Sequence, residues 1–182
     1  VSTRHAGPRS SDKVLVGSVE ESLSRGAEGV SVQVNMGSPD EPDMIERLGI
    51  ITQDAHFLDC PVLGMIYPRG ENLEVMDGDD TQGAAHAARL AFELGCDVVK
   101  TKWTGSIESF RKVTNSVPIP VLIAGGPAGS TTEETLTIVH QAMQAGGGGV
   151  CMGRQVFMHS SPGKMVTALR SIIHDGSDVK QA

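Results

Sequence analysis

The chain contains, at residues 97–105, the stretch DVVKTKWTG, in which a short apolar strand ends at Lys100. A lysine in this place is a candidate covalent nucleophile. Partial withdrawal from water and a second cation nearby both favour the uncharged amine, and that amine attacks carbonyl groups. Strand alternation places Lys100 and Lys102 on one face, so that Lys102 supplies like charge close to Lys100. The alternative is an ordinary lysine whose ammonium lies in solvent. The sequence around Lys100 has to distinguish the reactive lysine from the solvated one.

Five apolar runs rich in β-branched residues recur along the chain, and each is typical of a buried parallel strand. They are Gly29–Asn35, Pro61–Tyr67, Asp97–Lys100, Pro120–Ala124 and Gly148–Gly153. Stretches of helical periodicity lie between them, with expected capping boxes beginning at Ser18 and Thr131 and expected terminal glycines at Gly26, Gly95 and Gly146. The alternation of strand and helix predicts a parallel α/β fold, either an open doubly wound sheet or a barrel.

Composition indicates one domain over residues 1–182, because 182 residues that are 39% hydrophobic are enough for one core and no linker divides them. The net charge of −7 and the lack of a basic stripe argue against nucleic acid or an anionic membrane as a partner. No apolar stretch approaches ~20 residues, and no signal-peptide core opens the chain. Three scattered cysteines, Cys60, Cys96 and Cys151, are typical of buried thiols in a reducing compartment. We therefore expect a cytoplasmic protein.

The six histidines are far apart, and the chain has no HExxH motif and no cysteine–histidine cluster at ligand spacing. We therefore expect no catalytic metal, and no other cofactor. Neither a GxGxxG fingerprint nor a GxxxxGK[ST] loop occurs, which argues against dinucleotide and P-loop sites. Of the two common ways to polarise a carbonyl substrate, a metal or a lysine imine, only the lysine is visible.

Two glycine-rich segments follow strands, at residues 124–127 (AGGP) and 152–154 (MGR). Glycines at such places let backbone N–H groups approach an anion, and an arginine adds a fork of donors. The expected phosphate-binding residues are Ala124, Gly125, Gly126, Gly153 and Arg154. In eight-stranded barrels, substrate phosphate commonly binds at the loops after the last two strands, which is where these segments fall. For either segment alone, simple turn glycines would be an adequate explanation.

Tyr67 is the single tyrosine of the chain and ends its strand in MIYPRG, residues 65–70. A phenol there can serve as a general acid and base, although many such tyrosines only cap a core. Position favours the catalytic role, because Tyr67, Lys100 and the two glycine segments all lie at the same ends of successive strands.

Four motifs at these ends together resemble the archaeal-type class I aldolases, within the deoxyribose-phosphate aldolase and archaeal fructose-bisphosphate aldolase superfamily. They are MIYPRG at 65–70, VVKTKWTG at 98–105, IAGGP at 123–127 and MGRQVF at 152–157. The resemblance implies an eight-stranded (β/α)₈ barrel, with Lys100 as the Schiff-base lysine and Tyr67 as the proton donor and acceptor. It also implies that the glycine segments and Arg154 hold phosphate, that the substrates are a sugar phosphate and an aldehyde, and that the protein is a homo-oligomer.

Within this family, the segments at 32–38 (VQVNMGS), 67–70 (YPRG) and 172–175 (IIHD) resemble most the 2-amino-3,7-dideoxy-D-threo-hept-6-ulosonate synthases of aromatic amino acid synthesis. The resemblance implies a transaldolase-like enzyme that joins a phosphorylated ketose-derived fragment to aspartate semialdehyde. A glycolytic fructose-bisphosphate aldolase is the alternative. A barrel that binds sugar phosphate without catalysis, and a half-barrel that pairs with another chain, are further alternatives.

The chain is shorter than the complete barrel that the resemblance implies. A complete barrel needs about 250 residues and eight strands, whereas this chain shows five, with the tail of another at 1–3, and begins without methionine. The resemblance implies an essential aspartate on the first strand, and nothing matches it, unless Asp12, Asp54 or Glu71 replaces it. We therefore expect a fragment, the five C-terminal strand–helix units of a longer enzyme, that exposes its sheet edges when isolated. The alternative is a truncated form that lacks proton transfer at carbon.

Overall fold

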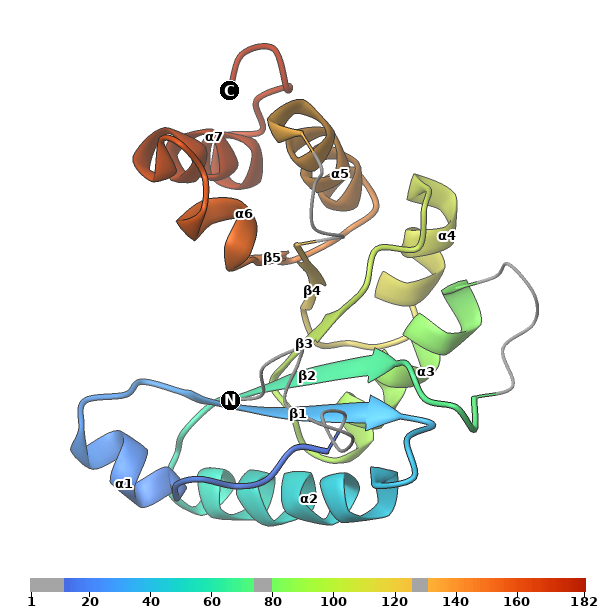
Figure 1. Cartoon of the computed structure of the whole chain (residues 1–182), viewed down its shortest axis with the longest axis vertical. Helices are drawn as coiled ribbons and strands as arrows, with labels where there is room; N and C mark the ends of the chain where they lie inside the picture. Colours follow the sequence, from blue (N-terminus) through green and yellow to red (C-terminus); the bar gives the residue numbers. More distant parts are fainter. Residues whose placement is uncertain (1–11, 74–79, 126–130) are drawn as a thin grey trace.

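The computed structural model describes residues 12–73, 80–125 and 131–182 (Figure 1). The strands in these ranges are β1 (Val30–Met36), β2 (Val62–Pro68), β3 (Val98–Thr101), β4 (Val121–Ala124) and β5 (Gly149–Cys151). The helices are α1 (Val19–Ser24), α2 (Glu41–Phe57), α3 (Asp80–Glu93), α4 (Ile107–Thr114), α5 (Thr132–Gln144), α6 (Arg154–Phe157) and α7 (Pro162–His174). All five predicted strands are confirmed to within a few residues at their ends.

The strands form one parallel sheet in the order β1-β2-β3-β4-β5, so each strand pairs with the next one along the chain. A doubly wound sheet reverses its strand order at a switch point, and this sheet has no reversal. Helix α2 contacts β1, and α3 contacts β2 and β3. Helix α3 contacts α4, α4 contacts α5, and α5 contacts α7, so these helices lie on the same face of the sheet (Figure 1). The arrangement is therefore the wall of a barrel, which decides between the two predicted folds.

Strand residues alternate between the helix-covered face and the opposite face. Val34, Val99 and Ile123 are completely buried on the helix side, against helix residues such as Leu48 and Phe110. The opposite face has no helix against it among the described residues, and its side chains are half-buried or polar. All five strands are parallel, so their carboxyl ends lie along one edge of the sheet. Polar side chains on this face at those ends therefore lie near one another.

The helix ends follow the expected chemistry with one exception. Thr131 and Glu134 form a complete capping box, and Gly26, Gly95 and Gly146 follow helices with φ near +88°, +85° and +88°. Ser18 accepts from the N–H of Glu21, as expected, but the Glu21 carboxylate pairs with Arg25 at 2.6 Å instead of returning to the cap. The second half of that capping box is therefore missing.

The three cysteines are free thiols, with Cys60 and Cys96 buried and Cys151 half-buried. No helix in the described ranges is both long and apolar enough to cross a bilayer.

Candidate active site

Lys100 lies on the face of β3 that carries no helix among the described residues, opposite the buried side chains of Val99 and Thr101. Its neighbours in register are Met65 on β2 and Leu122 on β4, and its side chain is half-buried. Among the residues that the structure describes, no group accepts a hydrogen bond from its ammonium or pairs with it. An amine without a fixed partner is available to react with a ligand that enters from this face.

Lys102 follows the end of β3, and its ammonium forms an ion pair with the Asp80 carboxylate at the start of α3. The like charge that we expect Lys102 to supply beside Lys100 is therefore accompanied by a counter-ion, the Asp80 carboxylate. Asp80 is 22 residues away in sequence, so strand periodicity gives no sign of it.

Tyr67 is the penultimate residue of β2 and lies on the same face as Lys100, two residues beyond the register partner Met65. Its side chain is 8% exposed, and the Arg69 guanidinium carbon lies 4.1 Å from the centre of its ring. Stacking of a cation on the ring fixes the ring plane and leaves the hydroxyl at the edge. The phenol has no hydrogen-bond partner in the described part of the chain.

The turn that follows Tyr67 rests directly on the end of β1. The N–H of Arg69 donates to Met36 O at 3.2 Å, and the N–H of Asn72 donates to Gly37 O at 2.9 Å. A Cβ on Gly70 would fall onto the backbone of Gly37, so only glycine fits there. This contact positions Tyr67 and Arg69 relative to β1.

The two glycine segments meet through a side chain that sequence reasoning missed. The Gln155 amide donates to Gly125 O, and a Cβ on Gly125 would lie 2.5 Å from Gln155 Oε1. Gly153 caps α6, whose first residue, Arg154, is exposed. The available signal was a polar residue directly after the MGR segment.

Ala124 pairs in register with Cys151, so the ends of β4 and β5 are adjacent. The remaining expected phosphate ligand, Gly126, lies outside the described residues.

The structure adds two amide side chains that we did not single out from the sequence. Gln33 Nε2 donates to Asn35 Oδ1 at 3.0 Å, and Asn35 is only 2% exposed. Both residues lie on the open face of β1, where Asn35 is in register with Tyr67, and Gln33 with Met65. Two polar residues alternating with valines in a strand were the available signal.

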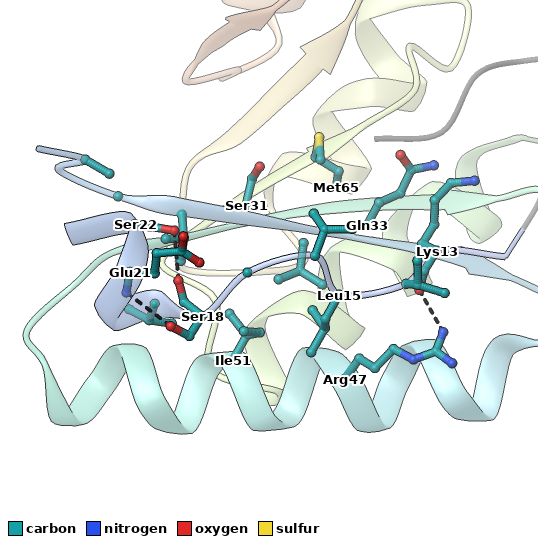
Figure 2. Close-up of a pocket in the computed structure, with 18 of the residues that line it drawn as sticks. Lys13, Leu15, Ser18, Glu21, Ser22, Ser31, Gln33, Arg47, Ile51 and Met65 are labelled. Atoms are coloured by element: carbon teal, nitrogen blue, oxygen red, sulfur yellow. Dashed lines mark hydrogen bonds between the residues drawn. The ribbon is translucent and has the colours of Figure 1, made fainter. Parts of the chain in front are cut away.

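A cavity of about 650 Å³ follows the edge of β1 that pairs with no other strand in the described ranges (Figure 2). Figure 2 shows Gln33, Ser31 and Met65 on the upper side of the strand, and Leu15 and Ile51 towards α2. Lys13 also lines this cavity. Partial burial, and then the nearby Arg69 guanidinium, lower the pKa of its ammonium, against an opposing effect of Asp12.

The alternative acids do not meet Lys100 in the arrangement described. The Asp12 carboxylate accepts from Arg47 at 2.9 Å beside α2, Asp54 is exposed on α2, and Glu71 is exposed after β2. No cluster of three or more His, Cys, Asp or Glu side chains that could hold a metal ion occurs within residues 12–73, 80–125 and 131–182.

Comparison with known proteins identifies the family. The model of the DeoC/LacD family aldolases matches residues 1–159. The chain belongs to the DeoC/LacD aldolase family. The expected resemblance to this family of aldolases is thereby confirmed.

Two curated relatives refine the position within the family. The chain is 45% identical over 177 residues to 2-amino-3,7-dideoxy-D-threo-hept-6-ulosonate synthase of Halobacterium salinarum, which covers 97% of the chain and 65% of the relative. It is 41% identical over 174 residues to 2-amino-4,5-dihydroxy-6-oxo-7-(phosphonooxy)heptanoate synthase of Streptomyces griseus. This match covers 96% of the chain and 62% of the relative. The chain therefore spans less than two thirds of the length of these relatives.

A solved structure of an archaeal fructose-1,6-bisphosphate aldolase, with its catalytic lysine covalently bound to the carbinolamine intermediate, superposes with a TM-score of 0.81. It is 35% identical, and the match covers 88% of this chain and 63% of that one. The superposition confirms that the five-stranded wall belongs to an aldolase barrel.

Proposed function

We propose that the protein acts as a Schiff-base (class I) aldolase on a phosphorylated ketone, with Lys100 as the nucleophile. The observation that carries this proposal is the half-buried Lys100 ammonium, which has no protein partner in the described residues and lies on the open face between Tyr67 and the Gly125 segment. The covalent lysine of the solved relative supports a reaction of the same type.

The chemistry uses two side chains of this chain. The Lys100 amine attacks the ketone carbon to form a carbinolamine, and loss of water gives an imine. Removal of a proton from the adjacent carbon converts the imine to an enamine, which adds to the carbon of an aldehyde and makes the new carbon–carbon bond. Water then adds to the imine, and the ketone product leaves Lys100 free. Tyr67 is proposed to move protons to and from the bound substrate, because its hydroxyl lies on the same face.

Phosphate binding is assigned to the ends of β4 and β5. Ala124, Gly125, Gly126 and Gly153 would supply backbone N–H groups, and Arg154 would supply a charged fork. The hydrogen bond from Gln155 to Gly125 supports this assignment, since it holds the two segments together. Phosphate would then lie on the β4 side of Lys100 and the aldehyde on the β2 side.

The substrates follow from the two curated relatives, whose names both describe seven-carbon acids with an amino group at C2 and an oxo group at C6. If this site makes such a product by aldol addition at C4–C5, the acceptor is a four-carbon amino-acid aldehyde, aspartate semialdehyde. The donor is a ketone fragment whose C6 forms the imine. We therefore propose a role like that of 2-amino-3,7-dideoxy-D-threo-hept-6-ulosonate synthase, in the supply of aromatic amino acids.

The second candidate is a fructose-bisphosphate aldolase, and the superposition on the archaeal enzyme favours it as the alternative. The 7-(phosphonooxy) product named for the second relative requires dihydroxyacetone phosphate as its three-carbon donor, which is also the donor of a fructose-bisphosphate aldolase, whereas the 7-deoxy product of the first relative requires an unphosphorylated donor. With dihydroxyacetone phosphate as the donor, the two activities differ in the acceptor. Aspartate semialdehyde and glyceraldehyde 3-phosphate, offered in competition with a fixed donor, distinguish them. A barrel that only binds sugar phosphate would accept the donor without forming an imine.

Borohydride trapping tests the proposal in the intact protein. Incubation with dihydroxyacetone phosphate and borohydride should add the mass of the reduced donor at Lys100. Lys100→Met should abolish the adduct, while Lys102→Met should retain it. An adduct on Lys102, or none on the wild type, would contradict the proposal.

We further propose that the protein works as a homo-oligomer in the cytoplasm. The free cysteines suit a reducing compartment, and exposed apolar side chains such as Val16, Phe157 and Met158, each about four-fifths exposed, suit a subunit contact. Light scattering after gel filtration gives the subunit number, and a monomeric mass would refute the oligomer.

A further inference from the structure

The amide pair Gln33–Asn35 is the polar feature of the open face that the aldolase chemistry above leaves unused. The Gln33 side chain is half-buried, and its Nε2 is held by the buried Asn35 Oδ1 at 3.0 Å. With Nε2 directed at Asn35, Gln33 Oε1 points elsewhere, and no group among the described residues donates to it. A carbonyl oxygen held in this way accepts a hydrogen bond from an ammonium or a hydroxyl.

Strand register places this oxygen relative to Lys100. Gln33 pairs with Met65, and Met65 pairs with Lys100, so the three side chains form one row across β1, β2 and β3. Two strand spacings amount to about 10 Å. The half-buried Met65 between them forms an apolar floor.

The proposed product fits across the same strands in the same order. Its phosphate-bearing or terminal C7 would lie towards β4 and β5, and C6 on Lys100. The aldol carbons C5 and C4 would lie by Tyr67, and the C2 amino group towards β1. Five bonds of about 1.5 Å separate C6 from that nitrogen, an extended reach of roughly 6 Å. The imine bond to Lys100 and a hydrogen bond of about 3 Å to Gln33 Oε1 make up the remaining distance.

We infer that Gln33 is a specificity-determining residue whose Oε1 binds the ammonium group of an amino-acid aldehyde, and that Asn35 is the positioning residue that orients its amide. The inference rests on the proposed aldolase function and names the residue that selects the acceptor. Lys13, which lines the same cavity as Gln33, supplies positive charge that suits the carboxylate of such an acceptor.

A pair of acceptors that differ only in the amino group tests this inference in the intact protein. With saturating dihydroxyacetone phosphate, kcat/KM is measured for aspartate semialdehyde and for succinate semialdehyde. The wild type should prefer the amino aldehyde by about 10- to 100-fold, the range expected for one hydrogen bond to a charged group. Gln33→Met should remove this preference by raising KM for the amino aldehyde alone. Equal use of the two aldehydes by the wild type, or an unchanged preference in Gln33→Met, would overturn the inference.

Two controls separate this outcome from failure of the proposed function. Ser31→Ala, on the same face of β1 two residues earlier, should keep the wild-type preference, and a loss there would overturn the assignment to Gln33. The borohydride adduct at Lys100 should be equal in all variants. Its absence in the wild type would refute the proposed function and this inference together.

If Gln33→Met lost the adduct, Gln33→Glu would decide, because its carboxylate keeps an oxygen for the ammonium. Equal use of both aldehydes by Gln33→Glu would overturn the inference.

Discussion

Thr101 allows a stability prediction that follows directly from the structure. It lies on the helix-covered face of β3, is completely buried, and is the single side chain in the described ranges with a buried oxygen that lacks a hydrogen-bond partner. A buried unsatisfied hydroxyl costs about 1–3 kcal/mol, because its bonds to water are lost without replacement. Valine has the same branched shape and suits a strand equally well. We therefore expect Thr101→Val to raise the free energy of unfolding by about 1–3 kcal/mol.

Urea denaturation measures this gain as a higher midpoint at an unchanged m-value. In thermal unfolding, the Tm of Thr101→Val should exceed that of the wild type by about 2–4 °C per kcal/mol. The matched control is Thr52→Val on α2, where the hydroxyl is nearly as buried but donates to Gly49 O at 3.1 Å. That change should be neutral or cost up to about 1 kcal/mol. A Thr101→Val protein that is less stable at the same m-value would show that the hydroxyl is satisfied and that the reasoning is wrong.

Three further outcomes are expected. Burial, and then the neighbouring Asp97 carboxylate, raise the pKa of the Cys96 thiol from 9.0 to about 12. As pH rises, the Cys96 thiol therefore loses its proton in the unfolded chain before it does so in the folded chain. The free energy of unfolding should fall above pH 9, by ~1 kcal/mol at pH 10. Urea titrations of wild type and Cys96→Ala at pH 8 and 10 check this, and equal pH dependence would contradict it. Arg154→Ala should raise KM for a phosphorylated donor about 10- to 100-fold and leave an unphosphorylated analogue unaffected, and equal losses would mean a structural role. Gly70→Ala should cost at least about 2 kcal/mol, because its Cβ meets backbone, whereas Gly49→Ala, with open space around it, should gain up to about 1 kcal/mol in unfolding measurements.

Local chemistry explains why so much of the arrangement was predictable. Runs of β-branched residues marked all five strands, and glycines at 26, 95 and 146 marked helix ends, because burial and backbone freedom act on residues close in sequence. Motifs at the strand ends indicated the family, and the shared direction of parallel strands implied that Tyr67 and Lys100 would lie at the same end of the sheet.

Local sequence patterns thus specify the strands, the parallel α/β class, the family and the two candidate reactive side chains. Features that depend on pairing between distant segments became visible only in the folded chain. Sequential strand order selected the barrel wall over the doubly wound sheet, and Asp80 at the start of α3 forms an ion pair with Lys102. The hydrogen bond from Gln155 to Gly125 and the row from Gln33 to Lys100 appear only once register is set. Periodicity gives the face on which a side chain lies, whereas register and loop packing, which are set by contacts across the whole fold, give its neighbours.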